Sequence, residues 1–462
     1  MGFLTVLQDR ELRRRIFRLA WPTVTETALQ TLVQYVDTAQ VGRLGAEASA
    51  AVGLTATTTW LVNAPLWALG VGVLTCVSQA LGAEDQERAE RAAGQSLLLA
   101  LVAGVVMTVL TLSISPFLPV WLGADAAIRA DAERYFFIIC TPMLFRASAV
   151  IFAAALRAAG DTKTPMWIDL AMNTVNIALN FLLINEPQAL RLGTAEFAVW
   201  GAGLGVTGAA IATAVSYVVG GVWMFAAAER SPRLGGLKPV PDREMLRRCL
   251  GISTPIAAEH IVSMLGQVVF TAMVAKLGTI AVAAHAIAIT AEQVFYIPGY
   301  GMQTAASTLT GRYYGARDER KMMDHSMAVI LIAVALMSAL SLFLFLFPAF
   351  FMSIFTPDPA VIALGARVLR LVSVSEPFFA ALIILEGVFN GAGDVRMPLL
   401  FSILSMWGVR IFCTWVCVTR LHLGLTAVWG CMVADNLTRF ALMAHRYRGE
   451  RWKRGITIQN TD

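Results

Sequence analysis

Residues 22–45 read PTVTETALQTLVQYVDTAQVGRLG, and residues 255–278, which begin 233 positions later, read PIAAEHIVSMLGQVVFTAMVAKLG. Both stretches carry a proline at the first position, a glutamate at the fifth and Leu-Gly at the end. The same offset places Gly82 on Gly315 and continues through most of each half. An internal match at a fixed offset is typical of a duplicated structural unit. The sequence therefore predicts two related halves.

The composition indicates the class of protein. Of the 462 residues 57% are apolar and 15% are charged, and the mean hydropathy is +0.66. Soluble domains are about one quarter charged. Twelve membrane spans of about 21 residues would use roughly 250 positions, close to the apolar total. These values exclude disordered, collagen-like, coiled-coil and small disulfide-stapled proteins, and they predict an all-α integral membrane protein.

The hydrophobic runs divide into six spans per half. The expected spans are 16–43, 49–80, 93–120, 131–157, 165–186, 202–228, 248–276, 282–312, 324–352, 361–390, 398–420 and 425–446. An even number of spans gives both repeats the same orientation, so we expect two six-helix lobes related by a pseudo-twofold axis along the membrane normal, with a substrate pathway between them. We assign residues 1–228 to the N-lobe, the Pro-, Gly- and charge-rich segment 229–247 to a cytoplasmic linker, and 248–462 to the C-lobe.

Charge placement predicts the orientation. Most of the 36 Lys and Arg lie in runs on one side, from RELRRRIFR at 10–18 to HRYRGERWKR at 445–454. Positive loops stay in the cytoplasm, so we expect both termini there. No basic domain stands apart from the spans, which argues against nucleic acid as a partner. The six cysteines have no CxxC spacing, and no P-loop or HExxH motif occurs. We therefore expect no enzyme activity, no cofactor and no metal centre, with Na⁺ the only ion left open.

Polar side chains recur on single faces of several spans. In the first span Glu26, Gln30, Gln34, Asp37 and Gln40 follow spacings of four, four, three and three, which confines them to a sector of about 120°. Further polar positions in spans five, seven and eight are Asp169, Asn173, Asn176, Asn180, Glu259, Ser263, Gln267, His285, Glu292 and Tyr296. Such groups are costly in contact with lipid. We therefore expect these stripes to line a wet substrate cavity.

Asp37 is the sharpest candidate for an ion-coupling residue because it lies deep in the first span. An ionised carboxylate at bilayer depth costs roughly 2.5–3.5 kcal/mol, so such a group can exchange its charge for a proton or a cation. The alternative is a structural hydrogen bond to span five. Glu26 and Glu259 have the same two interpretations, coupling or structure, and Glu292 is evenly balanced between them. His285 fits an interior, hydrogen-bonded histidine better than a proton relay.

Other charges in the spans fit structural roles. Asp435 and Arg439 are four residues apart on span twelve, and this spacing predicts an ion pair. Glu386 has Arg410 and Arg146 as candidate partners.

Several motifs resemble those of MATE-type multidrug and toxic-compound extrusion transporters. They are the stretch Pro22 to Gly45, LRAAGDTKTPM at 156–166, NIALNFLLI at 176–184, LGTIAVAAHAI at 277–287, YGARD at 314–318 and NGAGD at 390–394. The resemblance covers essentially the whole chain. It implies a 6+6 helix fold in the cell inner membrane and the export of organic cations and other amphiphiles in exchange for H⁺ or Na⁺.

The resemblance also implies roles for particular residues. Asp37 matches the first-helix acid that carries the coupling ion in many members, supported here by Asn173, Asn176 and Asn180. Asn180 itself stands where many members have an aspartate. Glu259 resembles the helix-seven acid of NorM-like members, which use a cation site in the second lobe, although no companion acid aligns clearly on helix ten. The coupling ion stays open, with H⁺ favoured.

The expected partners are small amphiphilic molecules, H⁺ or Na⁺ and the lipid bilayer, and we expect a monomer. The alternative function is a lipid-linked precursor flippase of the same superfamily. Such a protein would need a cationic cavity, whereas the stripes here are acidic or amide.

Overall fold

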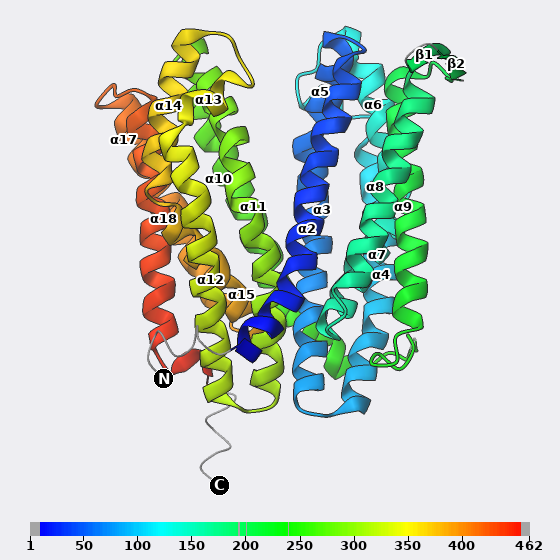
Figure 1. Cartoon of the computed structure of the whole chain (residues 1–462), viewed down its shortest axis with the longest axis vertical. Helices are drawn as coiled ribbons and strands as arrows, with labels where there is room; N and C mark the ends of the chain where they lie inside the picture. The colour runs from blue at the N-terminus through cyan, green and yellow to red at the C-terminus, as the bar shows by residue number, and fades with distance from the viewer. Residues whose placement is uncertain (1–9, 193–194, 200, 239, 454–462) are drawn as a thin grey trace. The chain divides into compact units, whose positions relative to one another are not determined.

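The computed structural model describes residues 10–192, 195–199, 201–238 and 240–453 (Figure 1). Contacts divide the chain into two compact units. We call Glu26–Val77 with Gln86–Ser253 the N unit. We call the part up to Thr25, Ser78–Asp85 and the part from Thr254 onward the C unit. The outermost residues of the predicted lobes, 1–9 and 454–462, lie outside the described residues.

The elements of the first half are helical apart from one hairpin. They are α2 (Arg10–Gly42), α3 (Ala46–Gly82), α4 (Gln86–Ile114), α5 (Leu118–Trp121), α6 (Ala126–Cys140), α7 (Met143–Ala158), α8 (Lys163–Ile184), β1 (Gln188–Leu192), β2 (Ala195–Val199) and α9 (Gly205–Glu229). The strands β1 and β2 pair antiparallel, with Gln188 opposite Val199. This hairpin in the loop between α8 and α9 is the one departure from the all-helical prediction among the described residues.

The second half repeats this order without a described hairpin. Its elements are α10 (Arg243–Ala275), α11 (Thr279–Gly315), α12 (Glu319–Leu346), α13 (Pro348–Ser353), α14 (Pro359–Ser373), α15 (Glu376–Ala392), α16 (Arg396–Ser405), the π-helical turn η1 (Met406–Ile411), α17 (Phe412–Thr419), α18 (Leu425–Arg448) and the 3₁₀ turn η2 (Arg451–Lys453). Each of the twelve predicted spans corresponds to one helix or to consecutive helical segments.

The predicted fourth and tenth spans are bent pairs rather than continuous helices. The α6–α7 pair bends by 49° and the α14–α15 pair by 56°. Pro142 precedes α7, and Pro377 lies in the first turn of α15. A proline removes a backbone donor and disfavours helix in the residue before it, which accounts for both breaks.

Most of the helices meet the length and composition needed to cross a bilayer. Among the described residues eight helices do so, and the two bent pairs bring the number to ten. The remaining predicted spans are occupied by α2 and α18, continuous helices of 33 and 24 residues that carry more polar and charged side chains. The fold is that of an all-α multi-pass membrane protein.

Repeat-equivalent aspartates cap the first helix of each bent pair, α6 and α14. The Asp125 side chain accepts a hydrogen bond from the backbone nitrogen of Ala127 at 3.1 Å. The Asp358 side chain, 233 residues later, accepts one from the nitrogen of Ala360 at 2.8 Å. A carboxylate at this position satisfies a free N–H of the first turn and stabilises a helix by about 1 kcal/mol.

Two repeat-equivalent glycines allow α3 and α11 to cross closely within the C unit. A Cβ atom at Gly82 would lie 1.9 Å from the carbonyl oxygen of Arg312, and one at Gly315 would lie 1.9 Å from that of Gln79. No side chain fits at such distances, so glycine is required at both positions. The match of Gly82 with Gly315 in the sequence thus reflects a helix crossing.

The boundaries between the units fall beside prolines that interrupt the hydrogen bonding of long helices. Pro22 lies inside α2, four residues before the N unit begins at Glu26, and Pro255 lies inside α10, next to Thr254, the first residue of the C unit there. Beside Pro22, the hydroxyl of Thr23 donates to the carbonyl oxygen of Gly301 at 2.8 Å. This bond anchors the first turns of α2 on α11.

The segment between α9 and α10 is packed against the N unit. The Gln95 side chain of α4 donates to the carbonyl of Val240 at 2.8 Å and accepts from the nitrogen of Asp242 at 3.3 Å. The carboxylate of Glu229 accepts from the nitrogen of Leu237 at 2.7 Å. The described part of the predicted linker is therefore held in place rather than extended.

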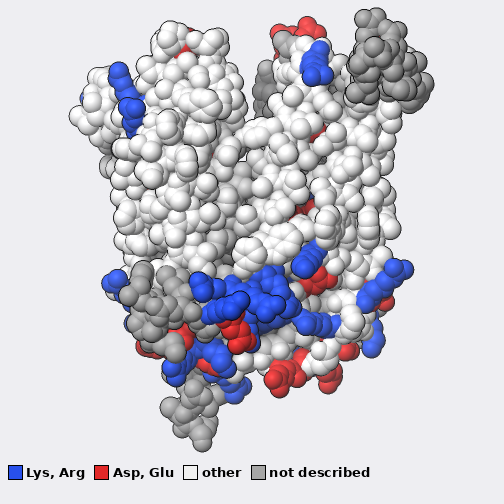
Figure 2. Space-filling model, in the orientation of Figure 1, with Lys and Arg blue, Asp and Glu red and all other residues white. Residues whose placement is uncertain are grey.

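Basic side chains gather at one end of each unit (Figure 2). In the C unit this end holds exposed Arg13 and Arg14 near the start of α2 and exposed Arg448 at the end of α18. In the N unit it holds Arg88 and Arg91, which begin α4. The distribution follows the uneven charge of the sequence.

Candidate functional site

Asp37 lies in a cluster of amide side chains within the N unit. Its Oδ1 accepts a hydrogen bond from Asn180 Nδ2 at 2.6 Å. The Asn176 amide, with its nitrogen turned toward the carboxylate, donates to the same oxygen at 2.8 Å and accepts from Thr213 Oγ1 at 3.3 Å. Asn176 and Asn180 are buried, whereas Asp37 is half-buried. The structure thus brings together the predicted residues of spans one and five.

Glycine on α9 explains how this cluster assembles. A Cβ atom at Gly208 would lie 2.5 Å from the carbonyl oxygen of Leu183, so α8 and α9 pack with their backbones in near contact. This approach brings Thr213 of α9 to Asn176 of α8. The regular spacing of Asn176 and Asn180, four residues apart, places both amides on one face of α8 toward Asp37.

The amide cluster has unused hydrogen-bonding capacity. Asn180 Oδ1 and Asn173 Nδ2 are buried without a hydrogen-bond partner among the described residues. Buried polar atoms are nearly always satisfied in native proteins by protein, water or a ligand. The two free atoms therefore favour a site that a proton, water or ligand completes. Gln34 is exposed on α2.

A second polar group of the N unit surrounds Glu26. The Arg157 guanidinium of α7 donates to Glu26 Oε1, and the Asp169 carboxyl lies within hydrogen-bonding reach of Glu26. Gln30 Nε2 donates to Asp169 Oδ2 at 3.2 Å. Glu26 and Asp169 are buried. Glu26 thus lies between an arginine and a second acid, and the sequence predicted no partner for it.

Glu259 of the C unit is paired in a different way. The guanidinium of Arg439 on α18 donates to Glu259 and, at 2.6 Å, to Glu386 Oε1 on α15. Gln303 Nε2 of α11 donates to the other oxygen of Glu386 at 3.3 Å. Glu386, an acid of the predicted tenth span, therefore lies close to Glu259, and Arg439 bridges the two acids. Among the described residues the ion-pair partner of Glu386 is thus Arg439, and the predicted partners Arg410 and Arg146 are wrong.

Glu292 of α11 lies beside a second acid, Glu376, at the start of α15. Glu376 is 1% exposed and Glu292 is 6% exposed, and neither oxygen of Glu376 has a donor among the described residues. Two adjacent buried carboxyl groups cannot both be ionised unless a cation lies between them. This pair is therefore a candidate site for protonation or for binding a cation. Sequence reasoning missed it because Glu376 precedes a proline at a bend that was predicted as a straight span.

The predicted pair of Asp435 with Arg439 is wrong. Asp435 Oδ2 instead accepts from Arg410 Nε at 2.7 Å, and Arg410 also donates to Gln267 Oε1 at 3.3 Å and to Asn436 Oδ1 at 3.2 Å. Arg410 lies in the π-helical turn η1, whose extra residue turns its side chain toward α10 and α18. Gln267 is thus held by an arginine.

The remaining predicted residues have aromatic neighbours. His285 Nδ1 accepts from the indole nitrogen of Trp429 at 3.2 Å, and its ring meets that of Phe270 edge-on at 5.6 Å. The Tyr296 ring contacts those of Tyr300 and Phe379 at 5.9 and 5.5 Å. Within the described residues no group of three His, Cys, Asp or Glu side chains is placed to hold a metal ion.

Comparisons with known proteins show the family of the chain. The family model MatE matches residues 22–182 and 255–416, two segments that start 233 residues apart. "Probable multidrug resistance protein NorM" of Thermotoga maritima is 28% identical over 97% of this chain and 95% of its own. "Multidrug resistance protein NorM" of Burkholderia vietnamiensis is 24% identical over 93% of this chain and 92% of its own.

Solved structures share the fold. A MOP superfamily transporter from Pyrococcus furiosus, whose binding pocket is described as having reversed polarity, superposes with a TM-score of 0.87 at 24% identity over 97% of each chain. A crystal structure of MATE in the straight conformation also gives 0.87 at 24% identity, over 98% of this chain and 99% of that one. These likenesses confirm the predicted twelve-helix architecture.

Proposed function

Because this chain belongs to the MatE family, we propose that it is a secondary active antiporter that exports lipophilic, mainly cationic drugs or toxic metabolites. The chain is a multi-pass membrane transporter and not an enzyme, since its family consists of transporters. Relatives named as multidrug resistance proteins along nearly the full length support drug export. The coupling ion in the proposal is H⁺, with Na⁺ as the alternative.

The observation that carries the proposal is the environment of Asp37. Glu26, Glu259, Glu386 and Asp435 each have an arginine partner. Asp37 has neutral amide donors in Asn180 and Asn176 and no arginine or lysine among its described contacts. A membrane carboxylate without a fixed counter-charge is free to exchange a proton for a cationic substrate.

The amide of Asn180 suits both protonation states of Asp37. Its nitrogen donates to the carboxylate, while its oxygen has no partner. After protonation the carboxyl hydroxyl can donate to this oxygen once the amide turns over, because an amide offers both donor and acceptor. In the proposed cycle ionised Asp37 holds the cation on the cytoplasmic side. A proton arriving from the other side neutralises Asp37 and releases the cation.

The C unit offers the competing coupling site. The Glu292–Glu376 pair is buried, and no arginine or lysine hydrogen-bonds to it in the described structure. Two other acids of the C unit, Glu259 and Glu386, differ from this pair because both are neutralised in part by Arg439. Na⁺ coupling would favour this pair over Asp37, because two carboxylates supply more oxygen ligands than one.

The proposal includes the predicted orientation and assembly. The basic ends of both units face the cytoplasm of a cell whose inner membrane the protein spans, in accordance with the positive-inside rule. Residues 1–228 and 248–462 act as two six-helix lobes joined by 229–247, and the transporter works as a monomer. Gln30, Gln34, Asn173, Gln267, His285 and Tyr296 contribute to the substrate cavity.

The flippase alternative is disfavoured by the pairing of three partly buried arginines. Arg157, Arg410 and Arg439 each contact a carboxylate. A site for a lipid-linked phosphate would need guanidinium groups free of such partners. Arg146 differs from these three, since it lies over the Tyr217 ring at 4.9 Å and donates to Asn63.

Efflux from proteoliposomes tests the proposal. Ethidium release is measured under an imposed pH gradient and then under a Na⁺ gradient for wild type, Asp37→Asn and the control Asp125→Asn. Asparagine also caps helices, so the control keeps the first turn of α6. We expect pH-driven efflux in wild type and control. In Asp37→Asn, ethidium should be released no faster than from liposomes without protein. Wild-type efflux in Asp37→Asn would refute the role of Asp37, and Na⁺-driven efflux in that variant would move coupling to the C unit.

A further inference from the structure

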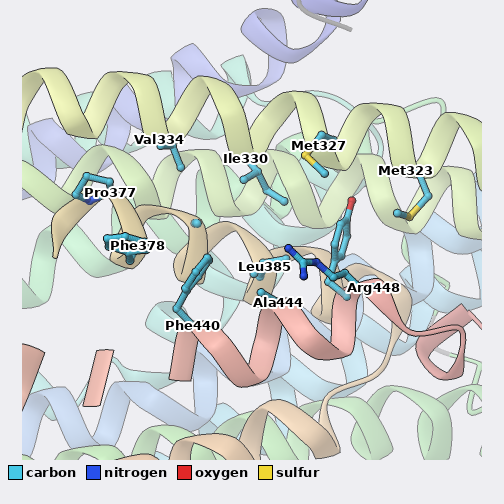
Figure 3. Close-up of a pocket in the computed structure, with 12 residues that line it drawn as sticks. Met323, Met327, Ile330, Val334, Pro377, Phe378, Leu385, Phe440, Ala444 and Arg448 are labelled. Carbon is cyan, nitrogen blue, oxygen red and sulfur yellow. The ribbon is translucent and has the colours of Figure 1, made fainter. Parts of the chain in front are cut away.

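A groove on the C unit lies among α12, α15 and α18 (Figure 3). Its volume is about 470 Å³, within the range of ligand pockets. Met327, Ile330 and Val334 of α12 face Phe378 of α15 and Phe440 of α18 across it. The lining is apolar apart from Tyr447 and Arg448.

The two polar side chains of the groove differ in their partners. The hydroxyl of Tyr447 lies 2.6 Å from Ser326 Oγ and is engaged in that bond. Arg448 is the charged lining residue, is exposed, and has no ion pair among the described residues. It lies in the last turn of α18, at the same end as the start of α12, because Lys453 just beyond it pairs with Glu319 at 2.7 Å. A cationic group thus lies at one end of the apolar groove.

The equivalent region of the N unit, among α4, α7 and α9, is tightly packed and has no space for a groove between Leu144 or Phe145 and the facing glycines. Leu144 of α7 packs on Gly104 of α4, where an added Cβ would lie 2.6 Å from the Leu144 Cα. Phe145 packs on Gly221 of α9, where an added Cβ would lie 2.3 Å from its carbonyl oxygen. The residues 233 positions after Leu144 and Phe145 are Pro377 and Phe378, and both line the groove. The groove of the C unit therefore lies where close helix packing on glycine leaves no space in the N unit.

The length of the groove matches one leaflet of a bilayer. Met323 and Val334 of α12 line its two ends and are eleven residues apart, which corresponds to about 16 Å of helix. Half of a hydrocarbon core of about 30 Å is about 15 Å. Methionine side chains adapt to flexible apolar ligands such as acyl chains.

We propose that this groove binds an anionic phospholipid of the surrounding membrane, with an acyl chain along α12 and α18 and the phosphate at Arg448. Basic pockets between membrane helices on the cytoplasmic side suit anionic head groups. The guanidinium offers a planar pair of donors to phosphate oxygens. The inference is independent of the coupling ion and of the exported substrate.

Native mass spectrometry of the purified full-length protein tests the proposal, with dioleoyl phosphatidylglycerol and dioleoyl phosphatidylcholine as probes. Arg448→Gln removes the charge, and Ala444→Trp fills the groove. The matched controls are Arg451→Gln, an exposed arginine outside the groove, and Val109→Trp, an exposed apolar position on α4. Inorganic phosphate is added as a competitor to separate a lipid site from a site for soluble anions.

We expect wild type and both controls to retain phosphatidylglycerol in preference to phosphatidylcholine. Arg448→Gln should weaken phosphatidylglycerol binding about fivefold, to the level of phosphatidylcholine, and Ala444→Trp should lose both lipids. Equal retention by Arg448→Gln and Arg451→Gln would overturn the proposal. Displacement by inorganic phosphate would overturn it too, as would a dimer that Ala444→Trp converts to monomer. If Ala444→Trp fails to fold, the comparison of the two arginine variants decides.

Discussion

Arg439 is predicted to be the charge on which the packing of the C unit depends most. Its guanidinium bonds to Glu259 and to Glu386, and the three side chains are 20%, 14% and 18% exposed. Arg439→Gln leaves two largely buried carboxylates without a counter-charge. Removing one partner of such a pair costs about 3–5 kcal/mol. Two charge-assisted hydrogen bonds at about 1.5–3 kcal/mol each give a similar loss.

The expected loss corresponds to a measurable change in melting temperature. An unfolding entropy of about 2.1 cal/mol/K per residue amounts to roughly 1 kcal/mol/K over the chain, so a loss of 4 kcal/mol lowers the Tm by about 4 °C. Tryptophan fluorescence of the protein in detergent follows the transition. The control Arg420→Gln changes an exposed arginine that lies over the Trp415 ring, and it should shift stability by less than about 0.5 kcal/mol.

A double mutant separates the charge effect from lost packing. Glu259→Gln in the Arg439→Gln background removes one of the two unpaired carboxylates, so the pair of substitutions should cost less than their sum. A melting temperature of Arg439→Gln equal to that of wild type would refute the reasoning. Strict additivity of the two substitutions would refute the claim that the charges interact.

Three further predictions concern packing, a helix cap and the proposed site. Gly82→Ala should prevent or severely impair folding, whereas Gly53→Ala, where an added Cβ meets nothing within 4 Å, should leave the Tm unchanged or raise it slightly; the yield of monodisperse protein compares them. An ion pair and a backbone hydrogen bond lower the pKa of Asp318, so its contribution to stability is present above the ordinary carboxyl range and is lost as pH falls through the lowered value; urea unfolding of wild type and Asp318→Asn should therefore converge at acid pH, and a constant difference would contradict this. Asn180→Leu removes the 2.6 Å donor to Asp37 and should slow pH-driven efflux about tenfold or more, while unchanged efflux would mean that the amide has no role.

The repeat made much of the fold predictable. Gly82 and Gly315 recur because two helices cross at their backbones, and Asp125 and Asp358 recur because each caps a helix. Such residues are determined by local geometry, which duplication preserves. The bends at α6–α7 and α14–α15 were not predicted, although the prolines beside them gave a signal.

The partners of the buried charges could not be predicted from the repeat. Glu26 and Glu259 are equivalent, yet the first pairs with Arg157 on α7 and the second with Arg439 on α18. These arginines occupy non-equivalent positions, so the duplication carries no information about them. The spacing of Asp435 and Arg439 also gave a wrong prediction of an ion pair. The long side chain of an arginine reaches an acid on a neighbouring helix as easily as one in the next turn of its own helix.

The amide cluster was predictable for a different reason. Asp37, Asn176 and Asn180 recur at helical spacing on two helices that are both amphipathic within the membrane. Their polar faces must meet because neither can face lipid. The pair of Glu292 and Glu376 had no such periodic signal, since Glu376 lies at the bend where α15 begins.

Proton movement driven by substrate tests the central claim most directly. Proteoliposomes that contain a trapped pH indicator and no imposed gradient receive a lipophilic cation on one side, and the internal pH is recorded for wild type, Asp37→Asn and Asp125→Asn. The account predicts a substrate-dependent proton flux, opposite in direction to the cation, in wild type and Asp125→Asn and none in Asp37→Asn. A proton flux in Asp37→Asn equal to that of wild type would contradict it.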